Sequence, residues 1–173
     1  MKMAFNMLVK TCLHSRLSFK GDSVDISFSR DKEYKDEKVL FFIIDENNNT
    51  NSKMRRYLAD SKGRPHEGKL CDLLIYYSRD DLQNDVICFV ELKKNKADEK
   101  EAIEQVIETN NLFRKKYRNN YGKNMKWAAY IHYPNHGSSQ MNNKEKRDLL
   151  QDRFDKWQCS TINDIGSFIR ACV

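Results

Sequence analysis

Two acidic residues and a lysine stand at the ends of neighbouring apolar segments, where they could hold a divalent cation. Asp72 immediately precedes the apolar residues 73–77, and Glu91 lies near the end of the apolar residues 88–92, with Lys93 two positions later. Two carboxylates held close together repel each other unless a positive charge lies between them, and Mg²⁺ binds such hard oxygen ligands well. The spacing therefore predicts a carboxylate pair that a divalent cation can bridge.

A hairpin is the element that would bring these residues together. The two segments are rich in Leu, Ile, Val, Phe and Tyr and are separated by the polar residues 78–85, which predicts two buried antiparallel strands. If the loop is centred between Asp81 and Leu82, Asp72 lies opposite Glu91, with Cβ atoms about 4.5–5.5 Å apart. Lys93 returns to the same face because side chains alternate along a strand.

The rest of the chain predicts a single α/β domain spanning residues 1–173, with its core at about 38–133. We expect one mixed sheet flanked by helices. Strands are predicted at residues 24–30, 39–45, 126–133 and 157–162, the second of them central and covered on both faces. Helices are predicted at residues 98–117, 143–154 and 164–172, the first with Asp98 and Glu101 as a capping box. Residues 53–68 are basic and are predicted to be a loop.

Composition limits the classes of function. A net charge of +6 suits an anionic partner such as nucleic acid, although charge alone favours it only weakly. No apolar run approaches the roughly 20 residues of a membrane helix and no signal peptide is evident, so we expect a soluble cytoplasmic protein. Of the five cysteines, Cys71 and Cys88 lie inside apolar segments and are predicted to be small buried hydrophobes rather than disulfide or zinc ligands.

The motif around the hairpin resembles that of a known enzyme superfamily. Asp72, eighteen intervening residues and then Glu91-Leu92-Lys93 is similar to the D…(D/E)xK signature of the PD-(D/E)xK nucleases. In that superfamily the Asp opens the second core strand, the E-x-K closes the third, and a helix follows. Here the predicted helix carries Ala-Ile-Glu-Gln at residues 102–105, which resembles the glutamine-bearing motif of resolvase-like and RecB-like members. The resemblance covers residues 66–108.

The resemblance implies a restriction-endonuclease-like core and a metal-dependent nuclease, most simply a DNA endonuclease of a restriction, repair or anti-phage system. Asp72, Glu91 and the Leu92 backbone carbonyl would hold Mg²⁺, for which Mn²⁺ could substitute. Lys93 would contact the attacking water or a phosphate oxygen, and Gln105 would orient that water or Lys93. Contacts to nucleic acid are expected from Lys69, Lys94, Arg114, Lys115, Lys116 and Arg118. A homodimer or a partner protein would supply specificity, because so short a chain has no evident target-recognition domain.

The sequence also differs from the superfamily pattern at three positions. Cys71 stands where a proline often precedes the Asp, and Lys94 follows Lys93 where small relatives often have glycine. The upstream acidic ligand has no clear match, and Glu37, Glu46 and Glu67 are the candidates.

Structural alternatives exist for every candidate residue. Asp72 and Glu91 could be charged strand ends, residues 93–96 a solvated turn, Gln105 a surface residue, and the basic residues 114–118 a helix end favoured by the helix dipole. Two other functions therefore remain open. One is a nuclease-like fold without catalysis that binds nucleic acid or regulates, and the other is a protein-interaction domain.

Overall fold

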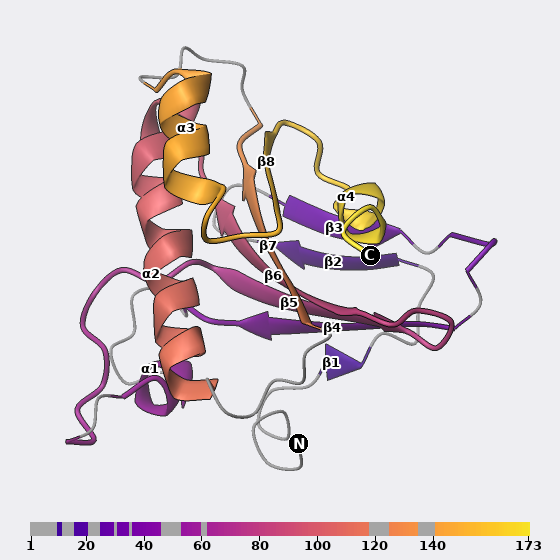
Figure 1. The fold of residues 1–173 in the computed structure, drawn as a ribbon, viewed down its shortest axis with the longest axis horizontal. Helices are drawn as coiled ribbons and strands as arrows, with labels where there is room; N and C mark the ends of the chain where they lie inside the picture. Colours follow the sequence, from indigo (N-terminus) through magenta and orange to yellow (C-terminus); the bar gives the residue numbers. More distant parts are fainter. Residues whose placement is uncertain are drawn as a thin grey trace.

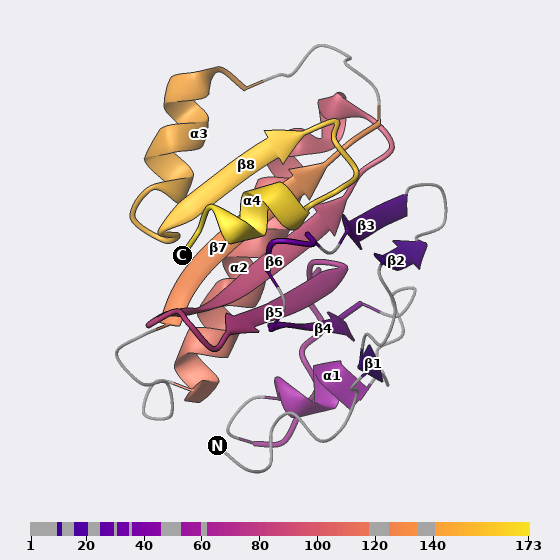
Figure 2. The same ribbon diagram turned by 90° about the vertical axis from the view of Figure 1, so that its right-hand side faces the viewer.

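The computed structural model describes residues 10–11, 16–20, 25–29, 31–34, 36–45, 53–59, 62–117, 125–134 and 141–173. These residues form an α/β fold in which a mixed sheet lies between two covering layers (Figures 1 and 2). None of the helices in the described part of the chain combines the length and the apolar character of a membrane-spanning segment.

The main sheet confirms the predicted mixed pairing. Its strands, in spatial order, are β1 (Lys10–Thr11), β4 (Glu37–Ile43), β5 (Leu73–Arg79), β6 (Asp85–Leu92), β7 (Met125–His132) and β8 (Lys156–Ser160). Neighbouring strands from β1 to β6 are antiparallel, whereas β7 joins β6 and β8 joins β7 in parallel. The predicted strands at 39–45, 126–133 and 157–162 correspond to β4, β7 and β8 with ends shifted by one or two residues.

Strand β4 is not central, contrary to the prediction from its apolar sequence. It pairs with β5 along seven residues but with β1 along only two. The central position belongs to β6, whose residues 86–90 are completely buried. An apolar run alone shows that both faces of a strand are covered, but it does not show how many strands lie beside it.

A second, two-stranded sheet corrects the prediction of a single sheet. The predicted strand at 24–30 is β3 (Asp25–Ser29), which pairs with β2 (Arg16–Lys20) and not with the main sheet. Ile26 and Phe28 of β3 are buried against one face of the main sheet. Alternation along β3 thus indicated its buried face correctly, while its pairing partner depended on a strand that the sequence did not reveal.

Four helices accompany the sheets. They are α1 (Lys53–Tyr57), α2 (Glu99–Tyr117, preceded by a 3-10 turn at Lys96–Asp98), α3 (Asn143–Leu150) and α4 (Gly166–Arg170). Helix α2 confirms the prediction for 98–117, and α3 and α4 are shorter than predicted. Helix α1 lies in the segment that was predicted to be a loop. The prediction was wrong because five residues carry too little apolar periodicity to indicate a helix.

Two hydrophobic clusters lie on opposite faces of the main sheet. On one face Leu74 and Phe89 pack with Ile103 of α2, and α1 and α3 contribute to the same layer. On the other face Cys88 packs in a cluster with β3 and with Phe168 of α4. Figure 2 shows α4 in front of the sheet and α2 behind it. Odd-numbered residues near the end of β6 therefore face α2, which places the Glu91 side chain on the helix side.

Candidate active site

The hairpin register brings Asp72 and Glu91 together as the loop position predicted. Leu73 pairs with Val90, so that Asp72 comes next to Glu91 at the edge of the sheet. The Asp72 N–H donates to Oε2 of Glu91 at 3.1 Å, and the Leu92 N–H donates to Oδ2 of Asp72 at 2.8 Å. Each carboxylate thus accepts a hydrogen bond from the strand that carries the other, which fixes both side chains.

Glu91 is the buried member of this pair, with only 3% of its side chain exposed. Burial, together with the charge of Asp72, raises the pKa of Glu91 to about 8, although Lys93 opposes the shift. The Lys93 ammonium lies 3.0 Å from Oε1 of Glu91. Because the pKa lies near 8 even with Lys93 this close, ionisation of Glu91 at neutral pH requires further positive charge, such as a bound cation.

Lys93 supplies positive charge to the site. Its ammonium lies 2.5 Å from Oε1 of Gln105 and 3.4 Å from Oε1 of Glu101, in addition to its contact with Glu91. Burial lowers the pKa of Lys93, but Glu91 and Glu101 raise it by more, so the net shift is upward. Lys93 is therefore a protonated donor, suited to binding negative charge and unsuited to accepting a proton.

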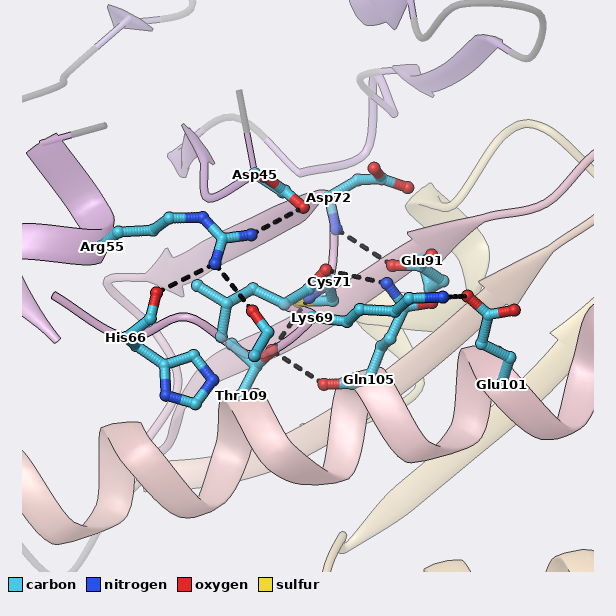
Figure 3. Close-up of polar contacts among 12 residues, drawn as sticks. Asp45, Arg55, His66, Lys69, Cys71, Asp72, Glu91, Glu101, Gln105 and Thr109 are labelled. Carbon is cyan, nitrogen blue, oxygen red and sulfur yellow. Dashed lines mark hydrogen bonds and ion pairs between the residues drawn. The ribbon is translucent and has the colours of Figure 1, made fainter. Parts of the chain in front are cut away.

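Gln105 is buried and connects α2 to the hairpin. Its Oε1 accepts from Lys93, and its Nε2 donates to the Leu70 carbonyl at 3.1 Å. One turn later on the helix, Thr109 Oγ1 accepts from the Cys71 N–H at 2.9 Å. Helix α2 thereby holds both Lys93 and the segment that leads into Asp72 (Figure 3). The alternative that Gln105 is a surface residue is wrong.

Glu101 is a member of this group that the sequence assigned only to helix capping. Its Oε1 accepts from Lys69 at 2.6 Å and lies 3.4 Å from the Lys93 ammonium. The signal was present in the sequence, because Glu101 precedes Gln105 by four residues and so lies on the same side of the helix. Lys69, predicted to bind nucleic acid, is exposed. Its ion pair with Glu101 connects it to Lys93, which in turn contacts Glu91.

Asp45 was also missed, and Arg55 lies in the basic segment that was predicted to be a loop. The Ile44 N–H donates to the Asp72 carbonyl at 2.8 Å, so the end of β4 lies beside Asp72. The buried Arg55 guanidinium contacts Asp45 Oδ2 at 3.1 Å and donates to the His66 and Gly68 carbonyls at 3.0 and 2.7 Å. Figure 3 shows Arg55 pointing toward Asp45. Asp45 follows an apolar segment and Asp72 precedes one, so the sequence could have indicated that both carboxylates lie at the same edge of the sheet.

Of the described candidates for an upstream acidic ligand, Glu37 does not join the pair. Glu37 lies at the opposite end of β4, where its buried carboxylate accepts from the Tyr77 hydroxyl and from Arg170, so its role is structural. Glu67 is exposed, and Glu46 lies outside the described residues. Among the residues that the structure describes, no three acidic, histidine or cysteine side chains cluster closely enough to hold a metal by themselves.

The donor set nevertheless fits a hard cation. Asp72 and Glu91 provide carboxylate oxygens, and the Leu92 carbonyl follows Glu91 directly in the chain. Mg²⁺ needs only one or two protein carboxylates, because it retains several waters and binds substrate phosphate. A cation beside these oxygens would also counter the burial and the repulsion by Asp72 that raise the pKa of Glu91.

The basic residues predicted to contact nucleic acid do not form one surface. Lys94 is exposed next to the site. The Arg114 guanidinium lies 4.6 Å from the centre of the Trp127 ring and donates to the Arg153 carbonyl at 3.0 Å, so it packs against the fold. Lys115 and Lys116 line a separate pocket. Arg118 lies outside the described residues.

Comparison of the chain with protein-family models, curated proteins and solved structures found no match. The chemistry of the site is therefore inferred from its own residues. These residues are a carboxylate pair, a protonated lysine and a buried glutamine at one edge of the sheet.

Proposed function

We propose that this protein is a metal-dependent nuclease of the PD-(D/E)xK superfamily, with a restriction-endonuclease-like core, and that it hydrolyses phosphodiester bonds, most simply in DNA. The observation that carries the proposal is the pairing of Asp72 with Glu91 across adjacent strands, with Lys93 and Gln105 on the same face. The order of elements also agrees, since a hairpin is followed by α2 and then by the parallel strand β7.

Each residue has a distinct role in this proposal. Asp72, Glu91 and the Leu92 carbonyl would hold Mg²⁺ or Mn²⁺, which when bound supplies Lewis-acid stabilisation of the charge that develops on the phosphate. Lys93, held protonated, stabilises negative charge on the substrate. Gln105 positions Lys93 from α2. The hydrogen bonds from backbone N–H groups keep both carboxylates oriented before substrate binds.

A cleavage assay tests the proposal. Plasmid, linear and single-stranded DNA and RNA are incubated with Mg²⁺, Mn²⁺ or EDTA and with wild type, Asp72→Asn or Lys93→Ala. We expect metal-dependent cutting by wild type and a loss on the order of 10²-fold or more in both variants, because each removes a charge that acts on the reacting phosphate.

The matched control is Asp148→Asn, which makes the same change on the exposed side of α3. This variant is expected to cut as wild type does. Cutting that persists in Asp72→Asn, or a folded wild type that is inert on every substrate with both metals, would refute the nuclease proposal.

One observation favours a second candidate, a nuclease-like protein that binds nucleic acid or regulates without cutting. The Lys93 ammonium already contacts three acceptors, on Glu91, Gln105 and Glu101. An ammonium has three hydrogens to donate, so Lys93 in this arrangement has none left for a substrate phosphate. Binding of nucleic acid by a wild type that cuts nothing would support this candidate. Absence of both binding and cutting would instead leave a protein-interaction domain.

A further inference from the structure

A second concave site lies beside the C-terminal half of α2. It is a pocket of about 550 Å³, and none of its lining residues belongs to the carboxylate site. The lining comes from the residues after α1, from the segment that leads toward Asp72 and from α2. These residues are Leu58, Ala59, Arg64, Pro65, His66, Glu67, Leu112, Lys115 and Lys116.

The lining joins apolar side chains to an excess of positive charge. Leu58, Pro65 and Leu112 are apolar, whereas three cations (Arg64, Lys115 and Lys116) stand against a single acid, Glu67. Pockets of this size that bind small molecules are mostly apolar, with a few convergent polar groups that fix the orientation of the ligand. The combination favours a ligand with an apolar body and a negatively charged group.

Only part of the basic end of α2 belongs to the pocket. Arg114 packs on Trp127 and bonds to the Arg153 carbonyl, so it points elsewhere. Lys115 and Lys116 line the pocket. The helix dipole accounts for basic residues in a last turn, but it does not account for their convergence with Arg64, which comes from another segment.

His66 contributes an imidazole ring whose place depends on Gly68. A Cβ at position 68 would overlap Nε2 of the His66 ring, so the ring lies where only glycine leaves room for it. Burial lowers the pKa of His66, although Glu108 opposes the shift. With this lowered pKa the ring is mainly neutral at neutral pH, so it lines the pocket without adding charge.

The pocket and the carboxylate site share one side of α2. Leu112 and Lys116 follow Gln105 by seven and eleven residues, close to two and three full turns, which corresponds to about 10 and about 16 Å along the helix axis. Phosphates of one strand are spaced by roughly 3.4 Å along B-DNA. A strand with this stacked spacing that passes Gln105 would reach the pocket after about three to five nucleotides, and an unstacked, extended strand would reach it after fewer.

We propose that this pocket binds one nucleotide of the strand that the carboxylate site cuts. The base lies against Leu58, Pro65 and Leu112, and the phosphate lies between Lys115 and Lys116. The identity of the strand rests on the proposed nuclease function, whereas nucleotide binding by the pocket does not. A base in the pocket has left its stack, so the substrate is single-stranded or has an unpaired nucleotide near the cut.

Binding of labelled oligothymidylates in EDTA tests the inference without any cleavage. Fluorescence anisotropy is measured for lengths from about two to about ten nucleotides, with wild type and with two pocket variants. Affinity is expected to rise steeply once the strand is about five nucleotides long. Lys115→Ala/Lys116→Ala is expected to weaken binding about tenfold or more and to lower the slope of log affinity against log salt by about 1.4.

Leu112→Trp fills the apolar part of the pocket without changing its charge. We expect weaker binding with an unchanged salt slope. Lys144→Ala/Arg147→Ala is the control, because it removes the same charge from exposed positions on α3. Melting temperatures identify any variant that fails to fold.

Several outcomes would overturn the inference. The first is that the pocket variants bind as tightly as the control. The second is that inorganic phosphate competes as well as thymidine monophosphate, and the third is that the mononucleotide binds as tightly as the longest strand. The two proposals fail separately. Pocket effects without cleavage by wild type would refute the nuclease alone, and cleavage with normal binding by both pocket variants would refute the pocket alone.

Discussion

At the scale of single residues, the site depends on a buried amide as much as on its charges. Gln105 accepts from Lys93 and donates to the Leu70 carbonyl, so one side chain connects the cation of the site to the backbone near Asp72. Gln105 and Leu70 are buried, which makes the bond between them costly to lose, because water cannot replace it easily.

Gln105→Ala is therefore expected to lower the free energy of unfolding by about 1–3 kcal/mol, since the Leu70 carbonyl and Lys93 each lose a partner. Urea denaturation measures this change. Glu104→Ala is the control, because Glu104 is the exposed neighbour on the same helix. Equal stability of the two variants would show that Gln105 does not connect α2 to the hairpin.

At the scale of elements, Asp164 attaches α4 to β3. Its Oδ1 accepts from the Ser29 N–H at 3.2 Å and from the Gly166 N–H at 2.9 Å. The backbones also meet, because Ser27 and Asp164 form an isolated bridge. Burial raises the pKa of Asp164, but the bonds from Ser29 and Gly166 and the charge of Arg170 outweigh it, so the pKa lies below its ordinary value of 3.8.

This shift has a defined sign for stability. A carboxyl group with a lowered pKa in the folded state stabilises the protein above its ordinary pKa, and the contribution disappears as the pH falls through the lower folded value. Asp164→Asn is expected to lose about 1 kcal/mol at neutral pH and less at pH values below about 3.8. Unfolding of wild type and variant across this range measures the difference. A difference that is constant with pH would show that ionised Asp164 adds nothing to stability.

At the scale of the whole molecule, the sheet is stable only with both faces covered. One face is buried by α2 with α1 and α3, and the other by β3 and α4. Helix α4 contributes Phe168 and Ile169 to the second cluster, and Arg170 forms an ion pair with the buried Glu37. Helix α4 thus covers the face of the sheet opposite the candidate active site.

Removal of residues 164–173 is therefore expected to abolish cooperative unfolding, because it exposes apolar side chains of the sheet and leaves the Glu37 charge buried without Arg170. Circular dichroism during heating measures this loss. Removal of Val173 alone is the control. A shortened chain that still unfolds in a single sharp transition would show that α4 is not needed to cover the sheet.

The sequence by itself determined the strands β5 and β6, their register, the helix α2 and the placement of Asp72 opposite Glu91. These features depend on local signals, namely apolar alternation, the length of a loop and helical spacing, which act within a few tens of residues. Only the tertiary structure decided that β3 leaves the main sheet, that β4 lies near its edge, and that Glu37 serves α4 instead of the site. It also brought Glu101 to Lys93, placed the end of β4 beside Asp72 with Arg55 on Asp45, and joined Arg64 to Lys115 in a pocket. Such contacts join residues far apart in the chain, and they depend on how whole elements pack, which no local pattern specifies.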